Sequence, residues 1–553
     1  MELIQIDHIT VSYITRIIFQ DLSWHIQDRE RIGLVGPNGS GKSSLLKVIN
    51  GDVVPDSGSI VRSKDLQVGY LPQDVDLPAG ETLLDAAMAL PPELARLEAA
   101  LTELEDLLGN PAVYNDEERL TRTLKRQEDL LEAYEARGGP RHASTVREIL
   151  RHLGFSSEDY DRPAQTLSGG QKKLIALTRL AAARPELLLL DEPDNHLDIN
   201  AKHRLEQFIN GYEGSVVIVS HDRYLLDEVA THIAELEGGK LTIYHGNYTA
   251  YTTERELQRL RQQQLYVAQQ KEIARIEAAI KRFELWASMV VDERHIRQAR
   301  SRRKLLERME ANGEIIEAVT ERRQMNLQIN GWRGSKKAVE ASGLAMAFDD
   351  ELLFTELSFV VRHGERVGFV GPNGAGKSVL FQLITGRLQP FEGEITIGPS
   401  TRIGYYAQEH QTLSAWLDRS PIELLRELRP MSENQAVTFL IKFQFTYDQV
   451  RQPIRTMSGG ERSRLQLARL MLQEPNLLLL DEPTNNLDIP SVEVLEETLD
   501  SFEGAVMVIS HDRYFLDRAV DQIIELEDSV LSFYPGGYTD YLDQKHKTGR
   551  VVR

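Results

Sequence analysis

One phosphate-binding pattern occurs twice in this chain of 553 residues. Residues 36–43 read GPNGSGKS and residues 371–378 read GPNGAGKS, so both fit G-x-x-x-x-G-K-[ST]. Each follows a short apolar run, at 31–35 and at 366–370, which predicts a strand, a glycine-rich loop and a helix. The backbone N–H groups of such a loop converge on phosphate oxygens, and the lysine adds a positive charge. Two matches in matched contexts favour two nucleotide sites over an incidental glycine turn.

Composition narrows the class of protein. No segment approaches the roughly 18 to 20 uninterrupted apolar residues of a membrane helix. The first residues, MELIQI, alternate as in a strand rather than in a signal sequence. The chain has no cysteine, which excludes disulfides and thiolate zinc sites. We therefore expect a soluble, cytoplasmic protein. Its formal net charge of −20 argues globally against a nucleic-acid partner, but local charge can differ.

Further segments of the two halves match. Gln73 and Gln408 are 335 residues apart, as are Gly36 and Gly371. Three later blocks are 290 residues apart: Ser168-Gly169-Gly170 and Ser458-Gly459-Gly460, LLLLDEPDNHLD at 187–198 and LLLLDEPTNNLD at 477–488, and Ser-His-Asp-Arg around His221 and His511. The first half therefore carries 45 additional residues between Gln73 and Ser168.

The additional segment has a helical pattern. Leucines at 94, 97, 101, 104 and 108 recur in steps of three and four. After the Gly-Asn-Pro of 109–111 the same spacing resumes with Leu120, Leu124, Gln127, Leu131 and Tyr134. Two such helices around a turn predict an antiparallel helical hairpin, an arm at about residues 90–140. We expect its leucines to join the two helices, which leaves the tip available to a partner.

A second long helix is expected between the halves, because residues 247–312 contain no Gly or Pro. A basic stripe lies in this segment, with one acid, Glu307, between Arg294 and Arg308. Such a stripe is either a solvated helix face or a local footprint for phosphate backbones. The candidate RNA-binding residues are Arg294, Arg297, Arg300, Arg302, Arg303 and Lys304.

The four-leucine blocks predict buried parallel strands that end in two carboxylates each. Asp191 and Asp481 are placed to hold magnesium, and Glu192 and Glu482 to polarise a water molecule as general bases. His221 and His511 follow other apolar strands and could contact the γ-phosphate. Each Ser-Gly-Gly turn precedes an expected helix, whose N-terminus is a second anion-binding edge. Two domains packed head to tail could sandwich one nucleotide between such edges.

These motifs resemble those of the ATP-binding cassette (ABC) ATPases over about residues 1–250 and 338–545. The resemblance implies that Lys42 shares a nucleotide with Ser458, and Lys377 with Ser168. It implies catalytic roles for the two glutamates and the two histidines. It implies ATP contacts at Tyr13, Gly36, Asn38, Gly39, Gly41, Lys42, Ser43, Ser44, Gln73, Ser168, Gly169, Gly170, Phe348, Gly371, Asn373, Gly374, Gly376, Lys377, Ser378, Gln408, Ser458, Gly459 and Gly460. It implies magnesium contacts at Ser43, Gln73, Asp191, Ser378, Gln408 and Asp481.

Within that superfamily the chain resembles the ABC-F class. The implied fold is α/β, with two P-loop domains in tandem, a helical-hairpin arm in the first and a long helical linker between them. The implied bounds are 1–250, 251–335 and 336–545, with a short tail at 546–553. The class acts on the ribosome and its P-site tRNA as translation factors, which favours the RNA interpretation of the basic stripe. The two domains would pair within one chain, without an obligate partner subunit or a membrane.

Two features depart from the class. Asp194 stands where the class usually has threonine, which puts the rate of the first site in question, and a long basic C-terminal extension is missing. An alternative is the energy-coupling subunit of a membrane importer, although the basic linker has no role there. A DNA-damage scanner is a further alternative, but the zinc-binding cysteines of one such group are absent. The sequence leaves open whether a translation factor of this kind is a housekeeping protein or protects the ribosome from antibiotics.

Overall fold

The computed structural model describes all residues except 14–15, 79, 91, 111–112, 114, 137, 290–296, 299, 305–306, 309–333, 349–350, 408–412, 444, 486, 528 and 548–553. The chain divides into two compact units, one formed by 1–248 with 325–553 and the other by 249–324. The first unit contains both predicted nucleotide-binding domains, here called the first and second cassette. Within the part of the chain that is described, no helix is long and apolar enough to cross a membrane.

The first cassette is built on a mixed sheet whose strand order, among the described residues, is β5-β6-β7-β3-β8-β9. Neighbours pair in parallel from β5 to β8, and β9 is antiparallel. The strands are β3 (Arg31–Val35), β5 (Val68–Leu71), β6 (Leu187–Asp191), β7 (Ser215–Val219), β8 (His232–Glu237) and β9 (Lys240–His245). A second, antiparallel sheet has the order β2-β1-β4 and comprises β1 (Glu2–Tyr13), β2 (Arg16–Gln27) and β4 (Ser57–Arg62).

The second cassette repeats this arrangement. Its mixed sheet has the order β14-β15-β16-β12-β17-β18 in the described residues, and its antiparallel sheet the order β11-β10-β13. The strands are β10 (Lys337–Phe348), β11 (Glu351–Arg362), β12 (Arg366–Val370), β13 (Glu392–Ile397), β14 (Ile403–Tyr406), β15 (Leu477–Asp481), β16 (Ala505–Ile509), β17 (Gln522–Glu527) and β18 (Val530–Pro535). The predicted four-leucine strands are β6 and β15, and every residue of both is buried.

Helices connect and cover the parallel strands, as βαβ crossovers require. In the first cassette they are α1 (Lys42–Asn50), α2 (Leu83–Met88), α6 (His142–His152), α7 (Gly169–Ala182), α8 (Ile199–Gly211) and α9 (Arg223–Val229). In the second they are α12 (Lys377–Ile384), α13 (Pro421–Leu428), α14 (Glu433–Lys442), α15 (Gly459–Leu472), α16 (Ile489–Asp500), α17 (Arg513–Ala519) and α18 (Tyr538–Lys547). Short 3₁₀ turns span Gly139–Arg141, Ser157–Asp159, Ala164–Thr166, Gln449–Arg451 and Ile454–Thr456.

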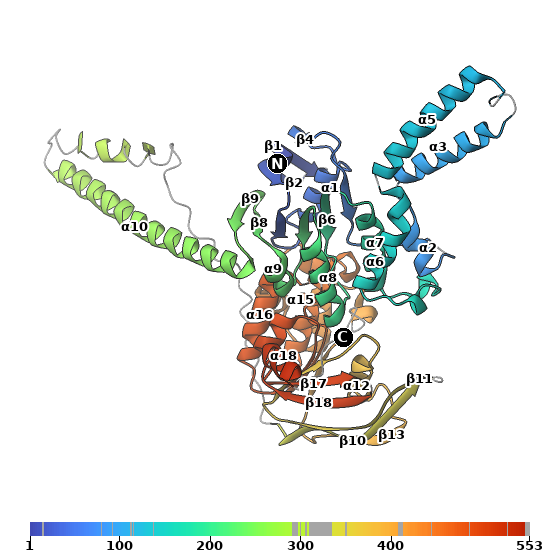
Figure 1. Cartoon of the computed structure of the whole chain (residues 1–553). Helices are drawn as coiled ribbons and strands as arrows, with labels where there is room; N and C mark the ends of the chain where they lie inside the picture. Colours follow the sequence, from blue (N-terminus) through green and yellow to red (C-terminus); the bar gives the residue numbers. More distant parts are fainter. Residues whose placement is uncertain are drawn as a thin grey trace. The chain divides into compact units, whose positions relative to one another are not determined.

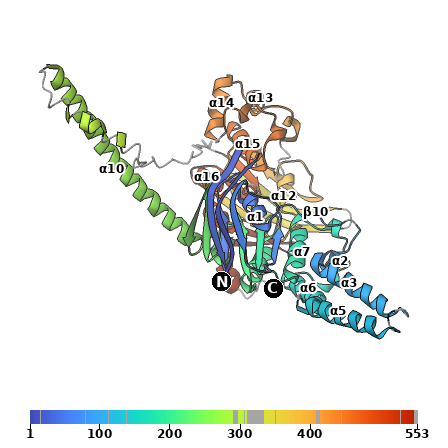
Figure 2. The same cartoon turned by 90° about the horizontal axis from the view of Figure 1, so that it is seen from above.

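The predicted arm is a helical hairpin. Helices α3 (Pro92–Leu108) and α5 (Glu117–Ala136) lie side by side, as Figures 1 and 2 show from two directions. Of the stepped leucines, Leu94, Leu101 and Leu104 are buried, whereas Leu124 and Leu131 are exposed. The stepped leucines therefore do two things, since some join the helices and others face outward.

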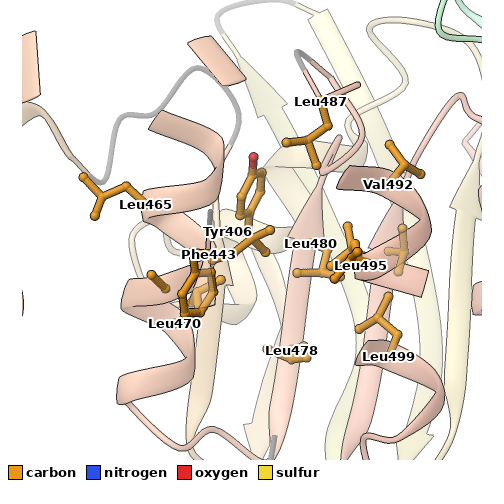
Figure 3. Close-up of a cluster of buried hydrophobic side chains, with 14 of the residues drawn as sticks. Tyr406, Phe443, Leu465, Leu470, Leu478, Leu480, Leu487, Val492, Leu495 and Leu499 are labelled. Atoms are coloured by element: carbon orange, nitrogen blue, oxygen red, sulfur yellow. The ribbon is translucent and has the colours of Figure 1, made fainter. Parts of the chain in front are cut away.

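A large apolar cluster in the second cassette fixes the strand that carries its carboxylates. Leu478 and Leu480 of β15 pack beside α15 and α16, whose Leu470 and Leu495 belong to the same cluster (Figure 3). Burying a leucine side chain contributes about 1.5–3 kcal/mol relative to leaving it exposed. The two carboxylates at the end of β15 are thus held on a rigid element.

The second unit begins with one long helix, α10 (Tyr248–Met289), drawn in light green in Figure 1. This confirms the expected long helix for the part of the linker that is described. Further along, residues 297–298, 300–304 and 307–308 are helical, and they carry most of the basic stripe.

Candidate nucleotide sites

Both glycine loops join a strand to a helix, as predicted. The first runs from β3 to α1 and the second from β12 to α12, with Gly41 and Gly376 as the left-handed N-cap residues. Gly36 and Gly371 lie against backbone: a Cβ added there would stand 2.3 Å from the carbonyl oxygen of Leu236 and 2.2 Å from that of Leu526. No residue with a side chain fits at either position, so the chain can follow this path only with glycine.

The two loop lysines are almost fully buried. Lys42 donates to the carbonyl oxygens of Gly36 (2.8 Å) and Pro37 (3.1 Å), and Lys377 donates in the same way to Gly371 (2.7 Å) and Pro372 (2.8 Å). Burial lowers the pKa of both lysines, although neighbouring carboxylates partly oppose this. Each ammonium group therefore lies inside its glycine loop, where phosphate oxygens could replace the carbonyl oxygens as hydrogen-bond acceptors.

A hydroxyl and a carboxylate meet beside each loop. Ser378 Oγ donates to Asp481 Oδ1 at 3.1 Å. In the first cassette Asp191 is 1% exposed, and its Oδ1 has no hydrogen-bond partner among the described atoms. Burial raises the pKa of Asp481 to about 6 and also raises that of Asp191. Buried oxygen ligands of this kind fit Mg²⁺, which typically takes one or two carboxylates and completes its shell with phosphates and water.

The two glutamates after these aspartates share an uncommon backbone conformation. Glu192 has φ 50° and Glu482 has φ 48°, in the left-handed region that costs a non-glycine residue free energy. In each, one carboxylate oxygen lies near Nε2 of the histidine from the next strand, at 3.6 Å for His221 and 3.5 Å for His511. Each cassette thus brings its predicted base and its predicted histidine together.

The two glutamates differ in their other neighbours. Glu192 accepts hydrogen bonds from the Gln73 side chain (2.8 Å) and the Asn195 side chain (2.5 Å). Burial would raise its pKa, but His221, Lys173 and Lys42 together lower it below the usual value. For Glu482, burial and the Asp481 charge raise the pKa to about 8, and its Oε1 has no hydrogen-bond partner among the described atoms.

The predicted signature serines cap helices. Ser168 is the N-cap of α7 and Ser458 that of α15, and each forms a capping box with the residue three positions on. Ser168 and Gly169 also line a cavity of about 670 Å³ together with Lys377, Ser378 and Asp481 of the other cassette. Two predicted anion-binding edges from different cassettes therefore face one cavity.

Reciprocal contacts join each loop to the opposite cassette. The backbone N–H of Asn38 donates to Asp488 at 3.0 Å, and that of Asn373 donates to Asp198 at 3.4 Å. Asp198 and Asp488 are equivalent, since they are 290 residues apart and cap α8 and α16. The two loops thus have matching partners across the interface.

A second reciprocal contact was missed by the sequence reasoning. Arg223 pairs with Glu496 and Arg513 pairs with Glu206, each pair spanning the two cassettes with both side chains almost fully buried. The guanidinium carbons also lie over aromatic rings of the other cassette, 4.1 Å from the centre of Tyr514 and 5.0 Å from that of Tyr224. The signal was available, because the arginines and glutamates each recur at the 290-residue spacing.

Other predicted residues stand as follows. Gly39, Ser44, Gly170, Gly374, Gly459 and Gly460 lie in the loops or helix starts described above. Gln408 and Arg294 lie outside the described residues, as do the side chains of Tyr13 and Phe348. In the basic stripe, Arg297, Arg300 and Lys304 are exposed. Arg303 pairs with Glu284 of α10 at 2.6 Å, and the guanidinium of Arg302 lies 4.8 Å from the ring centre of Phe283.

Fold and site define a tandem pair of ATP-binding cassettes, and comparisons with known proteins agree. A family model described as "ABC transporter" matches residues 19–195 and 354–485, and a second model with that description matches 234–329. "Putative ATP-binding protein YdiF" of Bacillus subtilis is 36% identical over 550 residues, covering 99% of this chain and 83% of the relative. "ABC transporter F family member 2" of Arabidopsis thaliana is 33% identical over 547 residues, covering 98% and 79%.

Solved structures share the fold. A structure titled "RNase-L Inhibitor" has a TM-score of 0.61 at 18% identity, covering 98% of this chain and 93% of that one. A complex of "archaeal ribosomal stalk protein aP1 and archaeal ribosome recycling factor aABCE1" has a TM-score of 0.61 at 17% identity, covering 98% and 92%. The chain belongs to the ABC ATPases and, within them, to the ABC-F family.

Proposed function

We propose that this protein hydrolyses ATP at two composite sites and uses the cycle to act on the ribosome and its tRNA. The first composite site comprises the loop of Lys42 with Glu192 and His221, completed by Ser458. The second comprises the loop of Lys377 with Glu482 and His511, completed by Ser168. The observation that carries the proposal is the shared cavity, where Lys377 and Glu482 of one cassette face Ser168 of the other.

The chemistry follows from charge and geometry. Backbone N–H groups of a loop and of the opposite helix start would hold the phosphates from two sides, so that nucleotide binding draws the cassettes together. Glu192 and Glu482 would orient and deprotonate the attacking water, with His221 and His511 beside them. Magnesium, held by Ser43 with Asp191 and by Ser378 with Asp481, would neutralise charge that develops on the phosphates. We further propose that Gln73 and Gln408 complete these magnesium sites, and that Tyr13 and Phe348 stack on adenine.

The ribosome assignment has separate support. Structural relatives include one titled "ribosome-bound archaeal Pelota and ABCE1", with a TM-score of 0.57 at 19% identity. In the second unit, Arg300 and Lys304 are exposed on a helical segment of an otherwise acidic chain, as a phosphate-contacting surface requires. Contact with rRNA or with P-site tRNA is the role we assign to the stripe, within the linker proposed at 251–335.

Ribosome sedimentation with the E192Q/E482Q variant tests the proposal. Removing both bases should preserve ATP binding and arrest the closed state, so the variant should co-sediment with ribosomes in ATP but not in ADP. The matched control is K42A/K377A, which should neither close nor co-sediment. If the E192Q/E482Q protein does not sediment with ribosomes in ATP, the proposed role in translation is wrong. The alternative function, the energy-coupling subunit of a membrane transporter, is then favoured.

The same assay tests the linker. R300E/K304E in the E192Q/E482Q background should lose ribosome binding while it retains ATP binding, because the reversal replaces attraction to phosphates by repulsion. Arg302 and Arg303 are poor choices, since both contact α10. R259E/R261E reverses two exposed arginines of α10 and serves as the control. Equal loss in both variants would refute a specific role for the stripe.

A further inference from the structure

Lys202 is a buried cation of the first cassette that contacts the second. It lies on α8 and is 7% exposed. Its ammonium donates to Asp222 Oδ2 of its own cassette at 2.9 Å and to the backbone carbonyl oxygen of His511 at 3.0 Å. Lys202 also lines the cavity that contains Lys377 and Glu482. One side chain of α8 therefore binds the backbone of the predicted catalytic histidine of the other cassette.

His511, whose carbonyl oxygen Lys202 binds, also contacts residues of the second site. The backbone N–H of His511 donates to Glu482 Oε2 at 3.3 Å, and His511 Nε2 lies 3.2 Å from Asn373 Oδ1. A shift of the His511 backbone would change both contacts. Placement of the base at the second site thus depends on a donor from the opposite cassette.

The equivalent position in the second repeat has no such donor. Val492, 290 residues after Lys202, lies on α16 beside Leu495 in the apolar cluster of Figure 3. The neighbouring difference is Asp194, whose equivalent is Thr484. Lysine and aspartate therefore stand together in one repeat, and valine and threonine in the other. The lysine and the aspartate occur together because a buried ion needs an opposite charge nearby, and the uncharged valine and threonine need none.

The surroundings of Lys202 keep it charged. Burial would lower the pKa of Lys202, but the carboxylates of Asp222 and Asp194 raise it above its usual value, with a further contribution from Asp512. Asp194 is 4% exposed and lines the same cavity, and its Oδ1 has no hydrogen-bond partner among the described atoms. Asp222 in turn lies 3.6 Å from Arg513 of the second cassette. The ammonium is thus part of a buried ionic cluster at the interface.

We propose that Lys202, supported by Asp194 and Asp222, is a positioning residue that acts in trans on the second composite site only. Its hydrogen bond to the His511 carbonyl holds His511 and Glu482 in place when the cassettes are together, and the first site has valine where this donor would stand. The inference rests on the proposed ATPase function and deepens it, because it makes the two sites unequal.

Turnover in single-site backgrounds tests this role. With E192Q, only the second site can hydrolyse ATP, and there Lys202→Met should lower kcat about tenfold, as expected for loss of a charged hydrogen-bond donor. The KM for ATP should change less, because Lys202 holds the backbone and not the nucleotide. With E482Q, only the first site remains, and the same substitution should have a much smaller effect. Lys202→Arg keeps charge and donors and should restore part of the kcat.

The control is Val492→Ala, which removes apolar contacts at the same helix position without removing a donor. It should leave turnover of the E192Q protein close to that of its parent. Equal losses for Lys202→Met in both backgrounds would show a general structural role and overturn the proposal, as would full activity of the E192Q/K202M protein. Failure of the proposed function is distinguishable, since both single-site parents would then lack turnover before Lys202 is changed.

Discussion

At the scale of single residues, the two predicted bases are in different electrostatic environments, although each follows the same Leu-Leu-Leu-Leu-Asp strand. Lys173 donates to the backbone carbonyl of Glu192 at 2.8 Å and helps to hold that carboxyl ionised. The equivalent residue of the second repeat is Ser463, which carries no charge. At Glu192, His221 makes the largest contribution that lowers the pKa and Lys173 adds to it, whereas at Glu482 the Asp481 charge adds to the effect of burial.

The two sites should therefore respond differently to pH. A base with a pKa near 8 is mostly protonated below that pH and active above it, so kcat/KM of the E192Q protein should rise as the pH passes through about 8. The E482Q protein relies on Glu192, whose pKa is lowered, and its kcat/KM should be flat over the same range. The pH dependence of kcat/KM reports the pKa values of groups in the free enzyme. Superimposable profiles would refute the assigned difference.

At the scale of elements, the interface between α8–α9 and α16–α17 combines reciprocal ion pairs with cation–π contacts. Buried pairs of this kind contribute little net stability, but removing one partner leaves an uncompensated charge. Because each pair spans the cassettes, opening them hydrates that charge. Removing one partner should therefore raise the free energy of the closed state more than it lowers the folding stability of either cassette.

Arg513→Met should shift the equilibrium away from the closed state by about 3–5 kcal/mol, because the buried Glu206 loses its arginine partner and keeps only the more exposed His203. The double variant R513M/E206M should recover part of that loss. The chain has no cysteine, so Val54→Cys and Phe391→Cys, both strongly exposed, allow selective labelling for energy transfer between the cassettes. Closure would be measured in ATP in the E192Q/E482Q background.

Arg518→Met is the matched control, because its side chain is 56% exposed and pairs with Glu496 at 3.3 Å. Arg518 lies in the same cassette as Glu496, and Glu496 keeps Arg223 as a partner, so this pair is not broken when the cassettes open and closure should change little. Equal effects of R513M and R518M would contradict the account of the buried pairs.

At the scale of the whole molecule, the repeat made much of the fold predictable. The loops follow their strands, and the carboxylates end β6 and β15. The arm lies where helical spacing predicts it, and α10 lies in the segment without Gly or Pro. These features depend on local patterns of polarity and on glycine, which a sequence displays directly. Two kinds of contact between the cassettes, the buried ion pairs and the Lys202 hydrogen bond, were harder to predict from the sequence.

The missed contacts join residues far apart in the chain. Arg223 and Glu496 are 273 positions apart, and Lys202 reaches a carbonyl 309 positions away. A motif shows which residues recur, but it does not show which repeat supplies the partner. The Lys202 contact is harder still to predict, because the second repeat has valine at the equivalent position and no motif marks the difference.

The central claim is that each site is completed by the opposite cassette, and signature substitutions in single-site backgrounds test it most directly. Ser168→Arg should abolish turnover of the E192Q protein, in which only the loop of Lys377 is active, and should leave the E482Q protein largely active. Ser458→Arg should do the reverse. Each substitution also removes a helix N-cap, which destabilises the protein by about 1 kcal/mol. This loss is the same in both single-site backgrounds, so it cannot make one background inactive and leave the other active. If Ser168→Arg instead silences the E482Q protein and spares the E192Q protein, each cassette completes its own site and the account is wrong.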